Sequence, residues 1–180
     1  MKKNNITVFL ALIFLGGWGN FFQISPANIY DSPRALPQQE MYHYTGSGEK
    51  TSLRDFKGKF VLAVFWSRYC APCVRELEDI NTFVKETSAN GIKVLLVSPE
   101  SEWHSLKEQK YFLQKYGAEK VDFYVDKRGN LSASLGIFKT PNTVIINRKG
   151  QEIGRIRGTR DWADEDFIEY IYKIKAQQNH

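Results

Sequence analysis

The sequence feature that most constrains the fold is a pair of cysteines, Cys70 and Cys73, that closely follows an apolar run. The run covers residues 60–65, is rich in aromatic and β-branched side chains, and contains no polar residue. Such a run is typical of a strand buried on both faces of a sheet. Pro72 lies between the cysteines, and proline is tolerated in the first turn of a helix. The sequence therefore predicts a central strand followed by a helix that begins at Cys70.

The rest of the chain repeats this alternation of strands and helices. Apolar, β-rich runs predict further strands, and apolar positions at helical spacing predict the helices between them. Alternating elements of this kind favour an α/β fold, with a mixed sheet covered by helices on both faces. The expected strands cover 92–98, 121–125, 142–146 and 152–157, and the expected helices cover 102–116, 131–135 and a last helix capped by Asp161.

The position of the cysteines at a helix start gives them different expected roles. Unpaired N–H groups and the helix dipole favour an anion at this end, so Cys70 is expected to be the exposed, attacking thiolate. Cys73 lies one turn further along and shares a face with the apolar Leu77 and Ile80. We therefore expect Cys73 to be more buried and to resolve a mixed disulfide formed on Cys70.

Other interpretations of a two-cysteine motif stay open at this point. The pair could form a structural disulfide or half of a metal site, including a copper site. The three histidines, His43, His104 and His180, do not lie at a local ligand spacing from the cysteines, and no metal is expected. The net charge of +5 comes from scattered basic residues, so nucleic-acid binding is not expected either.

Residues 1–27 have the composition of an export segment. Two lysines precede an apolar run, and small residues end at Ala27, which is the order found in secretory signal peptides. Residues 6–24 carry no charge and are nearly long enough to cross a bilayer as an uncleaved anchor. A buried N-terminal helix is the remaining alternative. Residues 28–42 contain two prolines and polar residues and are expected to tether a domain over 43–180.

The segment Phe65-Trp66-Ser67-Arg68-Tyr69-Cys70-Ala71-Pro72-Cys73 resembles the active-site segment of the thioredoxin superfamily. Its flanks are similar to the TlpA/ResA-type extracytoplasmic thiol-disulfide oxidoreductases. The matching positions are residues 52–59 before the central strand, Glu76 after the second cysteine, residues 136–143 around Pro141 and the turn at 147–150. The resemblance covers roughly residues 45–175.

This resemblance implies a three-layer α/β/α sandwich with a mixed central sheet and a C-terminal β-hairpin plus helix. It implies that Pro141 is cis and packs against the cysteines, and that the peptide group of Thr140 pairs with the substrate backbone. A trans turn proline is the alternative. Trp66 and Tyr69 are expected to wall the substrate site, although either could be a core aromatic. Arg68 adds positive charge near Cys70, or is only a solubilising residue.

Glu76 can be interpreted from the sequence alone. It shares one helix stripe with Cys73, Leu77 and Ile80, and a carboxylate in an apolar stripe is unusual. We expect it to act as the base for the resolving thiol; a solvated acid near a helix start is the alternative. Many thioredoxins carry a buried acid in the strand before the motif, where this chain has Val64.

Together these observations predict a redox enzyme that uses no cofactor other than its dithiol. The resemblance implies a reductase of disulfides in exported proteins, such as apocytochrome c, that is re-reduced by a membrane electron-transfer protein. It implies a place in the periplasm or on the extracytoplasmic face of the membrane. A DsbA-like oxidant, a copper-delivery module and a non-enzymatic binding module are the alternatives.

Overall fold

The computed structural model describes residues 27–43 and 48–178. The predicted export segment, except for Ala27, lies outside these residues. Among the helices that the structure describes, none has the length and apolar character needed to cross a membrane.

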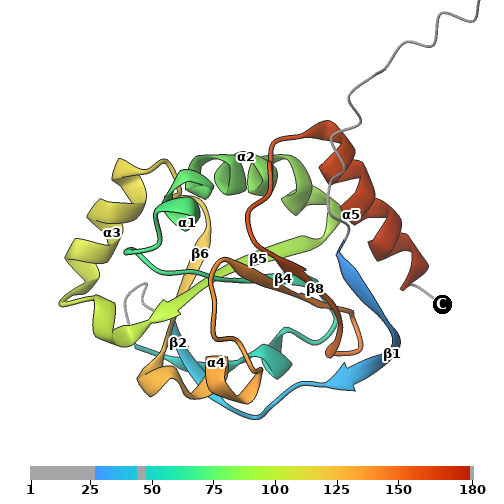
Figure 1. The fold of residues 1–180 in the computed structure, drawn as a ribbon, viewed down its shortest axis with the longest axis horizontal. Helices are drawn as coiled ribbons and strands as arrows, with labels where there is room; N and C mark the ends of the chain where they lie inside the picture. The colour runs from blue at the N-terminus through green and yellow to red at the C-terminus, as the bar shows by residue number, and fades with distance from the viewer. Residues whose placement is uncertain (1–26, 44–47, 179–180) are drawn as a thin grey trace, which may run out of the picture.

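The centre of the fold is a mixed sheet, which in the described part of the chain has eight strands (Figure 1). Their order across the sheet is β1 (Asn28–Ala35), β8 (Gln151–Arg157), β7 (Asn142–Ile146), β4 (Phe60–Phe65), β5 (Ile92–Pro99), β6 (Asp122–Asp126), β2 (Glu40–His43) and β3 (Lys50–Ser52).

Strand β4 lies near the middle of this sheet because it is apolar on both faces. All six of its residues are buried. It pairs in parallel with β5 and antiparallel with β7, so its carboxyl end, where the cysteine segment begins, is flanked by both neighbours. The strands expected at 60–65 and 142–146 are confirmed with the same bounds.

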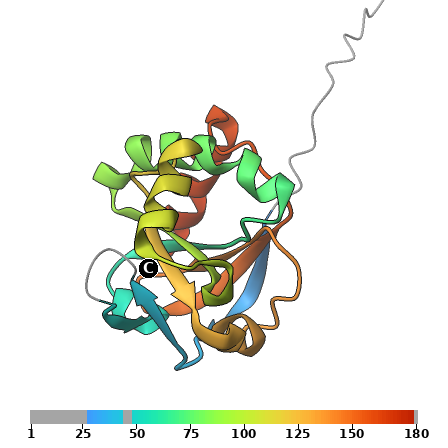
Figure 2. The same ribbon diagram turned by 90° about the vertical axis from the view of Figure 1, so that its left-hand side faces the viewer.

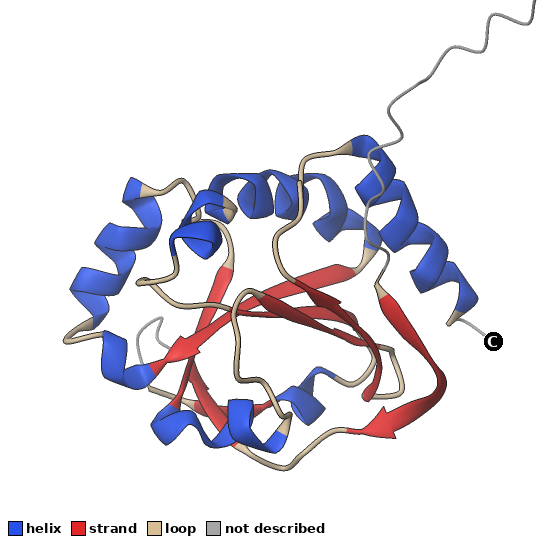
Figure 3. Ribbon diagram, viewed as in Figure 1, coloured by secondary structure: helices blue, strands red, loops and turns tan. Residues whose placement is uncertain are grey.

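Helices cover both faces of the sheet, which confirms the predicted three-layer α/β/α sandwich (Figures 2 and 3). One core lies between the sheet and the longer helices, and a second core lies on the opposite face, under α4 and η1. The elements of the first layer are α1 (Ala71–Arg75), α2 (Leu77–Thr87), α3 (Leu106–Lys115) and α5 (Glu165–Gln177), and those of the second are α4 (Asn130–Ser134) and the 3-10 helix η1 (Leu53–Phe56).

The expected tether at residues 28–42 is wrong, because much of this segment belongs to the sheet. Strand β1 pairs antiparallel with β8 at one edge, and β2 pairs with β6 near the other. Gly154 of β8 allows β1 to approach closely, since a Cβ there would lie 2.7 Å from the carbonyl oxygen of Asn28. The domain therefore starts at about residue 28 rather than at 43.

Two helix starts also differ from the prediction. The last helix is capped by Asp164, whose side chain accepts a hydrogen bond from the N–H of Phe167, and not by Asp161. The helix expected from 102 begins at Leu106, after the 3-10 turn η3 (Glu100–Glu102) and a cap at Ser105. The carboxylate of Glu102 is thereby available to contact the loop before Cys70.

Candidate active site

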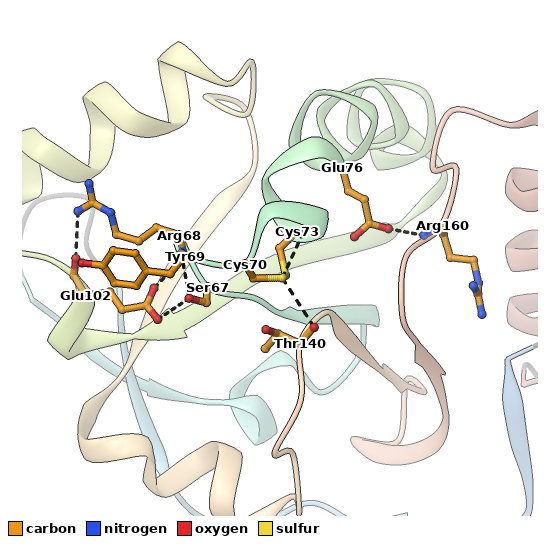
Figure 4. The surroundings of a disulfide bond; sticks show 9 residues. All are labelled: Ser67, Arg68, Tyr69, Cys70, Cys73, Glu76, Glu102, Thr140 and Arg160. Carbon is orange, nitrogen blue, oxygen red and sulfur yellow. Dashed lines mark hydrogen bonds between the residues drawn. A yellow bond between two sulfur atoms is a disulfide. The ribbon is translucent and has the colours of Figure 1, made fainter.

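The two cysteines lie at the start of α1, just beyond the end of β4, and form a disulfide (Figure 4). Their Cα atoms are 5.3 Å apart. Cys70 is the N-cap residue of α1, and its Sγ accepts a hydrogen bond of 3.3 Å from the backbone N–H of Cys73. At the start of α1 this N–H is the described contact that would stabilise a Cys70 thiolate, while Pro72 has no N–H to add.

The two sulfurs differ strongly in exposure. Cys70 is half-buried, whereas Cys73 is 1% exposed and belongs to the apolar core beside Leu77 and Ile80. This is the asymmetry that the sequence predicts. A disulfide of an incoming protein can therefore reach Cys70 but not Cys73.

The segment before β7 contacts the disulfide from the other side. The Thr140–Pro141 peptide bond is cis, as expected from the resemblance. The carbonyl oxygen of Thr140 lies 3.7 Å from Cys70 Sγ, and Thr140 is exposed (Figure 4). The Thr140 peptide group is thus placed where a substrate backbone next to Cys70 can bond to it.

Glu76 lies at the junction of α1 and α2, one turn after Cys73, and is 5% exposed. Its carboxylate accepts a hydrogen bond from the backbone N–H of Arg160 (Figure 4). Burial raises the pKa of Glu76 to about 7, while the Arg160 N–H and the Trp162 indole favour the carboxylate and limit the rise. A carboxyl group with this pKa is half ionised near neutral pH, as a general base should be.

The loop between β4 and α1 is held by two acidic residues that sequence analysis did not single out. Glu102 accepts hydrogen bonds from the Ser67 hydroxyl (2.6 Å) and from the Arg68 backbone N–H (2.8 Å). Glu108 pairs with the Arg68 guanidinium, which keeps the pKa of Glu108 below its usual value. The loop carries Cys70 at its end, so these contacts fix the place of the reactive sulfur.

The position of Arg68 limits what its charge can do for Cys70. Its guanidinium pairs with Glu108 and lies 4.7 Å from the ring centre of Trp103 and 5.2 Å from that of Phe112. The positive charge of Arg68 is thus paired with the Glu108 carboxylate and lies against the faces of aromatic rings. Arg68 is therefore neither a free solubilising residue nor the main counter-charge of a Cys70 thiolate.

Trp66 packs into the core beneath the site. It is 1% exposed and packs within 6.0 Å of the ring centres of Trp103, Phe112 and Phe123. Both expectations for Trp66 find support in the structure: it is a core aromatic, covered by these three rings, and it is also among the residues that line the cavity beside Thr140. Tyr69, in contrast, is 78% exposed beside Cys70, where it can meet a substrate.

A cavity of about 320 Å³ opens next to the Thr140 segment. Its walls come from the ends of β4 and β5, from α4 and from the loop that leads to Thr140. The lining is apolar at Phe65, Val97 and Ile137, and Phe138 stands at it with 85% of its surface exposed. Phe138 is thus an exposed aromatic side chain at the edge of an apolar cavity beside Thr140.

The structure also bears on the strand position before the cysteines and on the alternative of a metal site. Val64, at the place where many thioredoxins carry a strand acid, is fully inside the core, so Glu76 is the buried acid near the cysteines. Within residues 27–43 and 48–178 there is no group of three histidine, cysteine or acidic side chains suited to a metal ion.

Comparison with known proteins places this arrangement among thiol-disulfide oxidoreductases. The sequence profile of the AhpC/TSA family matches residues 34–152. The thiol-disulfide oxidoreductase ResA of Halalkalibacterium halodurans is 32% identical over 126 residues, which are 69% of this chain and 69% of that protein. The thioredoxin-like protein YneN of Bacillus subtilis is 36% identical over 152 residues, 83% of this chain and 87% of YneN.

Solved structures share the fold at lower identity. StoA from Bacillus subtilis superposes with a TM-score of 0.58 at 22% identity, over 72% of this chain and 94% of its own. The exposed lipoprotein thioredoxin Etrx1 of Streptococcus pneumoniae gives a TM-score of 0.60 at 22% identity, over 77% of this chain and 97% of its own.

Proposed function

The chain belongs to the AhpC/TSA family and is a thiol-disulfide oxidoreductase, and from this premise we propose that it is a reductase of disulfides in exported proteins. The observation that carries the proposal is the unequal cysteine pair. Cys70 is accessible and lies beside the Thr140 carbonyl, whereas Cys73 is buried in the core one helix turn before the buried Glu76.

The proposed reaction begins with the reduced pair. The Cys70 thiolate attacks one sulfur of a substrate disulfide; a Cys70–substrate disulfide forms, and the other substrate cysteine leaves as a thiolate that takes up a proton. Glu76 then accepts the proton of the Cys73 thiol, and the Cys73 thiolate attacks Cys70. The substrate's first cysteine leaves as a thiolate and takes up this proton from Glu76, so two electrons have passed from the enzyme to the substrate; of the two protons on the substrate thiols, one comes from Cys73 and one from solvent.

Substrate contacts follow from what surrounds Cys70. The Thr140 peptide group pairs with the backbone of an extended substrate segment, with Pro141 fixing its direction. Tyr69, exposed beside Cys70, contacts the substrate side chains. The family resemblance makes apocytochrome c the leading candidate among exported cysteine proteins, and a membrane electron-transfer protein the source of the two electrons.

The site of action in this proposal is outside the cytoplasm. The proposal rests on the charge and apolar pattern of residues 1–27, which serve as a signal peptide or a retained anchor. A reporter enzyme fused after residue 180 and active only outside the cytoplasm tests it, and fractionation into membrane and soluble pools separates anchor from cleaved signal. A full-length protein found in the cytoplasm contradicts it.

Trapping of substrates tests the reaction itself. A Cys73→Ser variant can form the mixed disulfide but cannot resolve it, so it should accumulate covalent complexes with exported cysteine proteins. The Cys70→Ser variant is the matched control and should accumulate none. The proposal fails if Cys73→Ser traps no more protein than Cys70→Ser, or if the trapped proteins are all cytoplasmic.

A further inference from the structure

A second cavity lies across one turn from the apolar cavity beside the disulfide. It has a volume of about 480 Å³. The turn is the 3-10 segment η4 (Lys127–Gly129) with Asn130: Gly129 lines the first cavity, while Lys127, Arg128 and Asn130 line the second. The segment directly precedes α4, which lies below the sheet in Figure 1.

The charge of this second cavity is positive and not balanced by its own acid. Glu40 lies on its wall, but its carboxylate is paired with Lys50 at 3.2 Å and accepts a hydrogen bond from the Tyr42 hydroxyl at 3.4 Å. Lys127 and Arg128 are exposed, and neither forms an ion pair with any residue that the structure describes.

Two further acids near this turn, Asp126 and Glu102, are engaged elsewhere. Asp126, directly before it, is buried, and its carboxylate caps α4 through the N–H groups of Leu131 and Ser132. Glu102 on the neighbouring η3 is bonded to the active-site loop. Glu100, also on η3, forms no ion pair with a described residue, so Lys127 and Arg128 face solvent with no paired counter-charge in the part of the chain that the structure describes.

The remaining lining of the second cavity suits a polar chain rather than an apolar one. Lys127 Nζ lies 5.0 Å from the ring centre of Tyr42, which gives the floor an aromatic face. Gln39 also lines the cavity, and its side-chain oxygen is buried without a hydrogen-bond partner among the described residues. A rotation of this side chain toward the cavity would let the oxygen accept from an N–H of extended peptide backbone.

From these observations we infer that the enzyme selects protein segments that carry an apolar side chain next to the reactive cysteine and acidic side chains several residues further along. The inference rests on the proposed function and names its substrate class. The apolar side chain fills the cavity at Ile137 and Phe138, and the acidic group meets Lys127 and Arg128. Both cavities border the turn at residues 127–130, and each residue of extended chain spans about 3.3 Å, so we place the acidic group several residues from the apolar one.

Peptide substrates test this directly. Each peptide carries one cysteine in a mixed disulfide with 2-mercaptoethanol, a leucine beside it, and either Glu-Glu or Lys-Lys placed four to six residues away, on each side in turn. In single-turnover reactions with excess reduced enzyme, the wild type should reduce the better Glu-Glu peptide with a second-order rate constant about tenfold above that for its Lys-Lys counterpart. This difference should shrink at high salt.

The decisive variant reverses both charges, Lys127→Glu with Arg128→Glu. It should lose or invert the preference, while its rate with bis(2-hydroxyethyl) disulfide stays that of the wild type. The matched control is Lys59→Glu with Lys149→Glu, which changes the net charge equally at exposed positions far from both cavities and should keep the wild-type preference.

The outcomes separate this inference from the proposed function. Equal rates on Glu-Glu and Lys-Lys peptides, or a preference that survives the Lys127/Arg128 reversal, overturn the inference alone. A preference lost equally in the Lys59/Lys149 control also overturns it, since net charge then explains the effect. An enzyme that reduces neither the peptides nor bis(2-hydroxyethyl) disulfide contradicts the proposed function instead.

Discussion

At the scale of single residues, the chemistry depends on the different solvent exposure of three side chains, Cys70, Cys73 and Glu76, spaced one helix turn apart. Cys70 is half-buried at the N-cap, while Cys73 and Glu76 are inside the core. Spacing alone indicated which cysteine would be inside, because Cys73 shares a stripe with Leu77 and Ile80. The burial of Glu76 could not be derived so fully, since the groups that cover it, Arg160 and Trp162, come from a distant part of the chain.

The reduced cysteines should differ in reactivity. Cys70 is accessible and gains from the helix N-terminus, so it should alkylate with iodoacetamide at least about tenfold faster than the buried Cys73 near neutral pH. Mass spectrometry of partly labelled protein gives both rates. Equal rates, or faster labelling of Cys73, would mean that the roles of nucleophile and resolving thiol are wrongly assigned.

The rate of disulfide exchange should depend on the ionisation of Glu76. Glu76→Gln keeps the shape and can still accept from the Arg160 N–H, but cannot take the Cys73 proton. Because the pKa of Glu76 is about 7, wild type and variant should have similar rates near pH 5.5, and the variant should be about 10- to 100-fold slower at pH 8. Glu78→Gln, an exposed acid two residues away, is the control. Overlapping pH–rate profiles of Glu76→Gln and wild type would reduce Glu76 to a structural acid.

The free energy of unfolding of the oxidised protein should also depend on the ionisation of Glu76. The raised pKa of Glu76 means that the folded state binds its proton more tightly than the unfolded chain, where the pKa is about 4.5. Relative to Glu76→Gln, the wild type should therefore lose about 1–3 kcal/mol of unfolding free energy as the pH rises from 4.5 to above 7. Urea unfolding at pH 5 and pH 8 measures this. The prediction is wrong if the free energies of unfolding of wild type and Glu76→Gln differ by the same amount at both pH values.

At the scale of elements, the central strands could be predicted and the edge strands could not. The runs at 60–65 and 142–146 are buried on both faces, so their composition alone identifies them. Strand β1 contains Pro33 and polar residues, is mostly exposed, and pairs with β8 only at its two ends. The sequence of such an edge strand resembles that of a linker, because the strand is stabilised by pairing with its partner rather than by its own composition.

What holds β1 in place is a buried ion pair on β8. Glu152 and Arg155 have side chains that are 4% and 9% exposed, and Glu152 also accepts a hydrogen bond of 2.7 Å from the Tyr30 hydroxyl of β1. Glu152 and Arg155 are three positions apart, so in a regular strand their side chains would point to opposite faces. The β7–β8 register shifts between Ile145 and Ile146, opposite this part of β8.

Removing one partner of this pair should be costly. Glu152→Ala leaves the Arg155 guanidinium buried without its counter-charge, and should lower the free energy of unfolding by about 3–5 kcal/mol. Glu169→Ala, which breaks the exposed Glu169–Lys173 pair of α5, should change it by less than about 0.5 kcal/mol. Urea titration compares the two. Similar small losses in both variants would show that the Glu152–Arg155 pair does not anchor β1.

At the scale of the whole molecule, the direction of electron flow depends on what the fold brings to the Cys70 thiolate. Ala71 and Pro72 offer no side-chain donor, and the charge of Arg68 is taken up by Glu108. The described contact that favours the thiolate is the N–H of Cys73 at the start of α1. A strong oxidant needs its reduced form stabilised much further than this, as the difference between about −120 mV for DsbA and about −270 mV for thioredoxin illustrates.

The reduction potential of the Cys70–Cys73 pair is therefore the measurement that tests the proposed reductase most directly. The purified protein is equilibrated with a series of dithiothreitol or glutathione redox buffers, and the fraction of reduced protein is counted by alkylation and mass spectrometry. A value closer to about −270 mV than to about −120 mV is expected, which makes the protein an electron donor to disulfides in an oxidising compartment. A value near about −120 mV would contradict the reductase assignment and identify the protein as a disulfide-forming oxidant.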